Sequence, residues 1–186
     1  MQRALLSRAY FSRPTVQVAR SLVGKYLVRS IDGLELAGKI VEVEAYVGPQ
    51  DKACHASKGR TKRTDVLYGP PGLAYVYLIY GMYHCLNVVT EREEFPAAVL
   101  IRAIEVEGEL IDGPGRLCQA LQIDRTLNRY DMTSGDRLWF EDRAVRIIRS
   151  SIGTFPRIGI DYAGVWARKP WRFRLDANPS RSRLHR

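Results

Sequence analysis

Apolar and polar residues alternate with a period of two along several stretches of the chain, which is the pattern of half-buried β-strands. These stretches are rich in β-branched and aromatic residues, and turn-forming residues separate them. The pair Asp32-Gly33, between the first two stretches, is the strongest short signal for a β-hairpin. The predicted strands are 26–31, 35–47, 74–79, 84–90 and 97–106, with a final pair near 145–148 and 171–175.

Two other segments carry helix signals. Residues 15–22 follow a proline and precede a glycine, and a second helix should run from Gly113-Pro114-Gly115 to about residue 123. Residues 48–65 are predicted to form a polar loop, and no repeat or linker divides the chain. These elements predict an α+β fold: a single domain over residues 1–186 with a curved, mostly antiparallel β-sheet, flanking helices and a protruding β-hairpin.

Composition adds little to this prediction until charge is considered. A chain of 186 residues with 46% hydrophobic residues is long enough to bury one core. The three cysteines are widely spaced, so they predict neither a disulfide framework nor a zinc site. They are expected to be small core residues of a protein from a reducing, intracellular compartment.

The charge balance is strongly basic, with 29 Lys and Arg against 20 Asp and Glu, a net charge of +9. An excess of this sign favours nucleic acid or an anionic membrane as partner, although it is also typical of a solvated surface. Basic residues gather in a loop (Lys58, Arg60, Lys62 and Arg63) and from Arg168 to the C-terminus, where a flexible tail is expected at about 176–186. Both clusters suit phosphate contacts.

Two segments have a second interpretation. The N-terminus is rich in arginine and has no acidic residue before Asp32, as in a transit peptide. Residues 66–90 carry no Lys, Arg, Asp or Glu and are long enough to span a membrane. Pro70-Pro71, three glycines and five tyrosines in that segment favour a strand-turn-strand unit instead, so no membrane contact is predicted.

The stretch 35–47 brings possible chemistry to one strand face. Alternation places Glu42, Glu44 and Tyr46 on one face, opposite a core face of Val41, Val43, Ala45 and Val47. Such a carboxylate face belongs either to a solvent-exposed sheet surface or to a catalytic site. Arg102 interrupts the apolar run 97–104, so it lies at an exposed edge or pairs with an acid inside the fold. A Glu–Arg pair near a cleft can orient and deprotonate water, and a simple buried ion pair is the alternative.

His55 follows the polar segment GPQDKAC. Together with Glu42, Glu44 and Asp51 it would suggest a hard-metal site, but the spacing matches no known ligand motif. We therefore predict no metal and no cofactor. His55 is better interpreted as an aromatic wall for a planar ligand, or as a loop histidine bonded to the backbone.

Four tyrosines gather in the segment YVYLIYGMYHCLN around a single glycine. Tyr75 and Tyr77 share a strand face, whereas Tyr80 and Tyr83 flank Gly81 at a turn. Core packing is the commonest use of such rings. Beside a basic surface, exposed rings can also stack on bases or wedge between them, and a second set can hold a flipped base.

Several blocks, taken in order, resemble the alkyladenine (3-methyladenine) DNA glycosylase family, whose members remove purine lesions in base excision repair. They cover residues 10–175 and are far more specific together than singly. The first block looks like the start of a folded domain, which argues against a transit peptide, and the lack of a long polar N-terminal extension points to a bacterial protein. The blocks are RPTVQVARSLVGKYLVR, IVEVEAYVGPQDKACHAS, GLAYVYLIYGMYHCLNVV, AVLIRAIE, GPGRLCQAL and RIGIDYAGVWARKPWRF.

The resemblance implies roles for individual residues. Glu44 would be the general base that activates a water to attack the sugar, while Arg102 and the backbone carbonyl of Ile158 would hold that water. Asn87 would read the base edge and disfavour guanine. Tyr80 would fill the gap left in the duplex, with Met82 helping to wedge. The walls that sandwich the flipped base would be Tyr46, His55 and Tyr77.

The function implied is a monofunctional hydrolase that cleaves the N-glycosidic bond of 3-methyladenine, other alkylpurines or hypoxanthine in double-stranded DNA. It would act as a monomer without metal or cofactor, in a bacterial cytoplasm at the nucleoid, or in the nucleus of a eukaryote. The segment TEREEFPA, residues 90–97, departs from the family pattern, so the range of lesions can differ. Two alternatives stay open: a non-catalytic nucleic-acid-binding module, and a metal-dependent nuclease built on Glu42, Glu44, Asp51 and His55.

Overall fold

The computed structural model describes residues 3–175, and the predicted basic tail at 176–186 lies outside these residues. Within them the strands form one antiparallel sheet, in the order β1-β8-β2-β3-β6-β5-β4, with β7 added at β6 and β9 added through β10. The strands are β1 (Ala4–Leu5), β2 (Tyr26–Ile31), β3 (Leu34–Val47), β4 (Ala74–Ile79), β5 (Tyr83–Val89), β6 (Ala97–Val106), β7 (Glu109–Asp112), β8 (Leu138–Asp142), β9 (Ile152–Phe155) and β10 (Arg172–Leu175). The predicted α+β fold with a mostly antiparallel sheet is confirmed.

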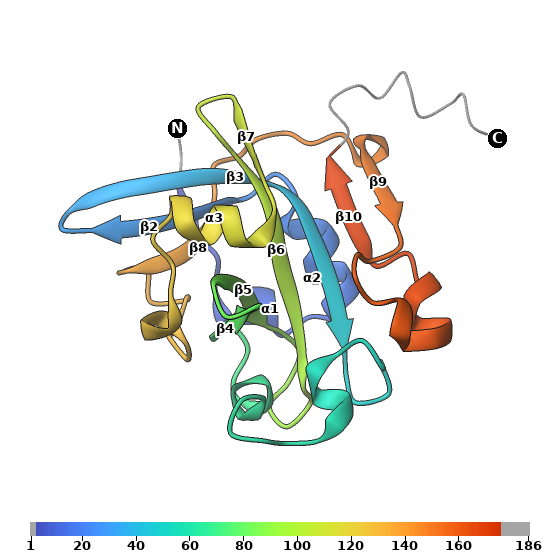
Figure 1. Cartoon of the computed structure of the whole chain (residues 1–186). Helices are drawn as coiled ribbons and strands as arrows, with labels where there is room; N and C mark the ends of the chain where they lie inside the picture. The colour runs from blue at the N-terminus through green and yellow to red at the C-terminus, as the bar shows by residue number, and fades with distance from the viewer. Residues whose placement is uncertain (1–2, 176–186) are drawn as a thin grey trace.

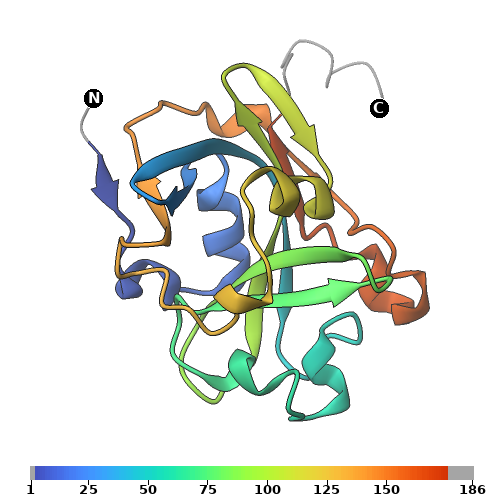
Figure 2. The same cartoon turned by 60° about the vertical axis from the view of Figure 1, so that its left-hand side comes forward.

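The long strand β3 is the centre of the sheet. Its first half pairs with β2, its second half pairs with β10, and β6 runs along its other side. The sheet is strongly curved, and the hairpin of β4 and β5 runs across the direction of β6 in Figure 2. Only residues Asn87–Val89 of β5 pair with β6, so the turn of this hairpin projects away from the sheet.

Over residues 3–175 the fold also contains three short α-helices: α1 (Arg8–Phe11), α2 (Thr15–Leu22) and α3 (Pro114–Ala120). Helix α2 buries Thr15, Val18, Ala19 and Leu22, which recur at the spacing of one helix face. Side chains of α2, α3, the β4–β5 hairpin and β10 join those of the central strands in one core cluster. Figure 1 shows how these elements surround β3 and β6. Within the described residues no helix is long and apolar enough to cross a membrane.

The turn-rich segments contain 3₁₀ turns. They are η1 (His55–Lys58), η2 (Asp65–Tyr68), η3 (Arg125–Leu127), η4 (Arg149–Ser151) and η5 (Asp161–Arg168). The predicted polar loop 48–65 therefore includes η1 and the start of η2. The three cysteines are free and buried, as predicted.

The end of the chain differs from the prediction. Residues 145–148 form no strand, and the side chain of Ile147 packs over Gly24. The partners of β10 are β9 and β3. Helix α3 ends at Ala120 rather than near residue 123, since Gln122 has a positive φ of 48° that no helix continues through.

A β-bulge in β3 corrects the predicted core face. The register against β6 shifts twice here: Val41 is an extra residue in β3 between Ile40 and Glu42, and Arg102 is an extra residue in β6. The extra Val41 reverses the alternation in β3 at that point. Ile40, Val43 and Ala45 therefore belong to the core cluster, whereas Val41 is buried outside it. The face that bears Glu42 and Glu44 is buried, not solvent-exposed.

Candidate active site

Two buried carboxylates on β3 meet two arginines from neighbouring strands. Glu42 and Glu44 are 3% and 0% exposed. Arg102 of β6 lies 3.3 Å from Glu42 Oε1 through Nε and 3.5 Å from Glu44 Oε1 through Nη1. Arg172 of β10 contacts Glu42 Oε1 through Nη1 at 2.9 Å. Of the two alternatives for Arg102, an exposed edge or a pair with an acid inside the fold, the structure shows the second. Arg172 is a partner that the sequence did not reveal.

Glu44 is held by two further contacts. Its Oε1 accepts a hydrogen bond from the backbone N–H of Ile158 at 2.9 Å, and its Oε2 accepts one from Tyr46 Oη at 2.8 Å. Burial, followed by the nearby Glu44 carboxylate, raises the pKa of Tyr46 well above its usual value, so this hydroxyl keeps its proton. Ile158 thus reaches Glu44 through its N–H, whereas the predicted role concerns its carbonyl.

A cavity of about 160 Å³ opens beside this carboxylate. Glu44 does not line it, but the three groups that contact Glu44 do. The cavity is of the size that accommodates a small ring system. Its lining includes Tyr46, His55, Tyr75, Tyr77, Asn87, Arg102, Ile158 and Tyr162. Every residue predicted to form the base pocket is therefore at this cavity.

The aromatic wall is rigidly connected. His55 Nδ1 lies 2.9 Å from Tyr75 Oη, and the ring of His55 meets that of Tyr77 edge-on at 4.7 Å. The rings of Tyr75 and Tyr77 are 5.1 Å apart. Burial, then the charges of Arg63 and Lys58, lowers the pKa of His55 to about 4. At neutral pH the wall is therefore aromatic and uncharged.

Asn87 closes another side of the cavity. It is 4% exposed, and its Nδ2 donates to the backbone carbonyl of Tyr75 at 3.1 Å. This bond fixes the amide plane and uses one of its two N–H donors. The side chain is thus oriented in advance of any ligand.

The hairpin turn presents two large apolar side chains to solvent. Tyr80 is 83% exposed and Met82 is 67% exposed. Tyr80 and Gly81 both have positive φ, 54° and 72°, and the N–H of Met82 donates to the carbonyl of Ile79 at 3.2 Å. A tyrosine is seldom found in this backbone region. The predicted turn is confirmed, and the ring of Tyr80 is not core packing.

A fully buried ion pair behind the cavity was not predicted. Arg157 donates to both oxygens of Asp51, at 2.5 and 2.8 Å, and both side chains are inaccessible to solvent. Arg157 also donates to the carbonyls of Ala45 and Trp166, and its guanidinium lies 4.7 Å from the ring centre of Tyr46. It thus connects β3, the following loop and η5 directly beside Ile158.

The side chains considered for a nuclease site have other partners. Asp51 is paired with Arg157, and Glu42 with two arginines. In the part of the chain that the structure describes, no three His, Cys, Asp or Glu side chains gather as they would around a metal ion. The geometry does not support the quartet Glu42, Glu44, Asp51 and His55 as ligands.

Comparison with known proteins gives a consistent result. A family model described as Methylpurine-DNA glycosylase (MPG) matches residues 9–179. A protein from Methanocella arvoryzae is 52% identical over 186 residues, which cover 91% of each chain. A protein from Legionella pneumophila (strain Corby) is 51% identical, and the match covers 94% of this chain and 96% of the relative. A protein from Anaeromyxobacter dehalogenans (strain 2CP-1) is 49% identical, and the match covers 96% of this chain and 85% of the relative. All three are named as candidate 3-methyladenine DNA glycosylases.

Proposed function

Because the chain belongs to the methylpurine-DNA glycosylase family, we propose that it is a DNA glycosylase that removes damaged purines from double-stranded DNA. Its substrates are 3-methyladenine, other alkylpurines and hypoxanthine. It hydrolyses the N-glycosidic bond as a monomer, without metal or cofactor, and leaves an abasic site in an intact strand. We expect it to work in a bacterial cytoplasm, at the nucleoid.

The observation that carries this proposal is the position of Glu44. A buried carboxylate stands directly behind an aromatic cavity and is held there by Tyr46, Arg102 and Ile158. In the proposed reaction the bond from sugar C1′ to the base breaks and its electron pair goes to the base. Water oxygen bonds to C1′ while Glu44 accepts a proton. The carboxylate also stabilises the positive charge that develops on the sugar.

Arg102 and Ile158 complete the reacting site. Arg102 offsets the charge of the two carboxylates and helps to hold the water, which also donates to the carbonyl of Ile158. Glu44 is inaccessible to solvent and already accepts two hydrogen bonds. Each carboxylate oxygen can accept a second bond. We therefore expect Tyr46 or Ile158 to shift when a nucleotide enters, so that water reaches Glu44.

Recognition of the base is assigned to the cavity walls. Tyr46, His55 and Tyr77 stack on the flipped base, and electron-rich rings attract a cationic purine by roughly 0.5–2 kcal/mol. Asn87 contacts the base edge and rejects the 2-amino group of guanine. Tyr80, helped by Met82, enters the duplex in place of the flipped nucleotide.

The chemistry is proposed to stop at hydrolysis. A glycosylase that also cuts the strand needs an amine nucleophile at the sugar. Within residues 3–175, no lysine lines the cavity. The product would therefore be a free base and an abasic strand.

Incubation with a panel of duplexes containing single lesions tests this function. The protein should release hypoxanthine and 3-methyladenine in the presence of EDTA, and the strand should break only after alkali. Undamaged duplex is the control.

Two results would contradict the proposal. Salt-sensitive binding without release of any base would favour a non-catalytic nucleic-acid-binding module using the same hairpin and basic surface. Strand cleavage before alkali that EDTA abolishes would favour the nuclease.

A further inference from the structure

Arg63 lies against the aromatic wall of the cavity. Its Cζ is 4.8 Å from the ring centre of Tyr77, and its Nε is 3.3 Å from Tyr75 Oη. Tyr75 and Tyr77 both line the cavity, together with His55. A permanent positive charge therefore borders the place where the proposed base would stack.

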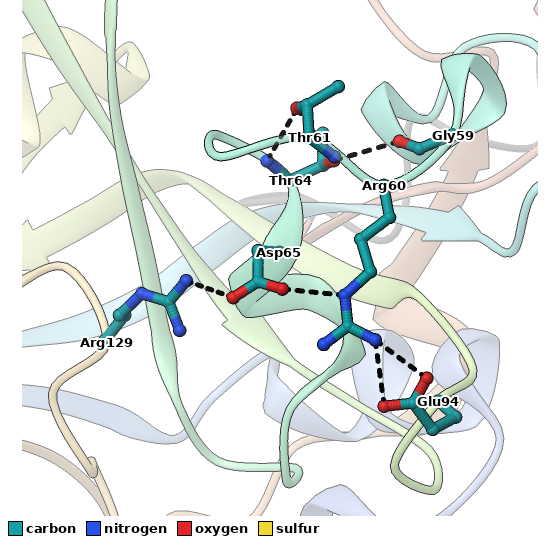
Figure 3. Close-up of polar contacts among 7 residues, drawn as sticks. All are labelled: Gly59, Arg60, Thr61, Thr64, Asp65, Glu94 and Arg129. Carbon is teal, nitrogen blue, oxygen red and sulfur yellow. Dashed lines mark hydrogen bonds and ion pairs between the residues drawn. The ribbon is translucent and has the colours of Figure 1, made fainter.

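The loop that carries Arg63 is fixed by its own hydrogen bonds. Thr61 and Thr64 bond to each other through backbone and side chain, at 2.8, 3.0 and 3.2 Å. The hydroxyl of Thr64 also donates to the carbonyl of Gly59 at 3.0 Å, as Figure 3 shows. Thr64 is buried at the centre of this turn. The position of Arg63, between the two threonines, is thus set by local structure.

An ionic network anchors the same loop to its surroundings. Asp65 lies between Arg60, at 2.7 Å, and Arg129, while Arg60 also contacts both oxygens of Glu94 (Figure 3). The charge of Arg60 is therefore compensated. No salt bridge within the described residues includes Arg63, whose charge faces the rings instead.

We propose that Arg63 is a specificity-determining residue that favours neutral damaged purines over cationic ones. This inference rests on the proposed glycosylase function. Arg63 would thus set a preference among the damaged purines from a loop position outside the lining of the cavity.

The two lesion classes differ in where charge moves. A neutral lesion such as hypoxanthine leaves with the bonding electron pair, so negative charge develops on the base until it takes up a proton. Overall, the nucleotide and water give an abasic sugar with a hydroxyl at C1′ and the neutral free base, which carries the proton. A nearby cation stabilises that charge. A cationic lesion such as 3-methyladenine leaves as a neutral base, and the proton from water ends in solvent. The same cation repels this lesion while it is bound.

Solvent limits the size of the effect, because Arg63 is exposed. We expect Arg63→Gln to lower the ratio of hypoxanthine release to 3-methyladenine release by about fivefold, which corresponds to about 1 kcal/mol. In this variant the rate of hypoxanthine release should fall, and the affinity for the cationic lesion should rise.

The test measures single-turnover release and lesion binding for both bases. Arg63→Lys keeps the charge and should keep most of the ratio. Lys62→Gln removes an adjacent exposed charge from the same loop and should leave the ratio unchanged. An NMR titration gives an independent readout, because the pKa of His55 should rise in Arg63→Gln and not in Lys62→Gln.

An unchanged ratio in Arg63→Gln would overturn the inference and leave the glycosylase function standing. Equal losses for both bases, with the His55 pKa unmoved, would show a merely structural role and would also overturn it. A wild-type protein that releases neither base would overturn the proposed function, and this inference with it.

Discussion

Glu44 and His55 show how neighbours prepare single side chains beside the cavity. Glu44 has no contact with solvent, and the donors of Tyr46, Ile158 and Arg102 surround its oxygens. His55 is kept neutral by burial and by the positive charge of Arg63. A neutral imidazole can stack on a base without repelling a positively charged one. Both residues are therefore held in a defined arrangement before any DNA arrives.

The low pKa of His55 predicts a dependence of stability on pH. The folded chain binds this proton only below about pH 4, whereas the unfolded chain binds it below its ordinary pKa of 6.5. Between these values the unfolded state holds more protons, so the free energy of unfolding should fall as the pH falls. At pH 5 the titration of His55 should lower the free energy of unfolding by on the order of 2 kcal/mol relative to neutral pH.

Urea unfolding at pH 7.5 and pH 5 measures this contribution. The variant His55→Gln should lose less stability on acidification than the wild type. His84→Gln removes a histidine from outside the cavity lining and serves as the control. Equal losses in His55→Gln and the wild type would show that His55 is protonated in the folded state.

Some residues of the proposed site could be predicted from the sequence, and others could not. Strand alternation grouped Glu42, Glu44 and Tyr46, and the apolar run around Arg102 marked that residue as unusual. Nothing local marked Arg157, because its burial depends on Asp51, which is 106 positions away. The pairing of distant charges is a property of the folded chain.

At the scale of elements, the hairpin of β4 and β5 separates two uses of tyrosine. The strands direct Tyr75 and Tyr77 to the cavity, while the turn exposes Tyr80. Alternation predicted that Tyr75 and Tyr77 share one strand face, but only Tyr77 was expected at the cavity, and that from the family resemblance; Tyr75 was expected to be a packing residue. The bounds of β4 and β6 were predicted to the residue. The bulge in β3 and the pairing of β9 with β10 were missed, since both depend on contacts between strands.

Tyr80→Ala should weaken binding to a lesion-bearing duplex without destabilising the protein. The side chain is 83% exposed, so its removal should change the free energy of unfolding by less than about 0.5 kcal/mol. Fluorescence anisotropy with labelled duplex, beside urea unfolding, measures both quantities. Tyr80→Phe keeps the ring and should keep the affinity. Unfolding of Tyr80→Ala would show that this ring is packing, not a wedge.

The ion pair of Arg157 and Asp51 predicts a large effect on stability. Arg157→Met would leave Asp51 buried and unpaired, which should cost about 3–5 kcal/mol in the free energy of unfolding. The double variant Arg157→Met with Asp51→Leu should recover part of this loss. Arg168→Met changes an exposed arginine at the end of η5 and is the matched control for urea unfolding. A loss below about 1 kcal/mol in Arg157→Met would contradict the account.

At the scale of the whole molecule, the cavity depends on the C-terminal part of the described chain. Strand β10 returns to pair with the segment of β3 that bears Glu42 and Glu44, and η5 precedes it in the chain. In Figure 1 the β9–β10 pair lies beside the lower half of β3. The composition predicted one core, but which strand would close it was not visible in any local pattern.

This arrangement predicts that the chain unfolds as a single unit. Because β3, β6 and β10 share one sheet with the N-terminal β2, loss of one part should remove support from the others. Far-ultraviolet circular dichroism and tryptophan fluorescence should give coincident urea transitions. Two separate transitions would show that the proposed single domain is wrong.

The role of Glu44 is the central claim, and single-turnover release of hypoxanthine from a duplex tests it most directly. Glu44→Gln should lower the rate by at least about 10²-fold, the usual contribution of a general base, while binding of the lesion duplex stays within a few fold. Glu42→Gln, two residues away on the same strand, should retain far more activity. Release of hypoxanthine by Glu44→Gln at the wild-type rate would contradict the account.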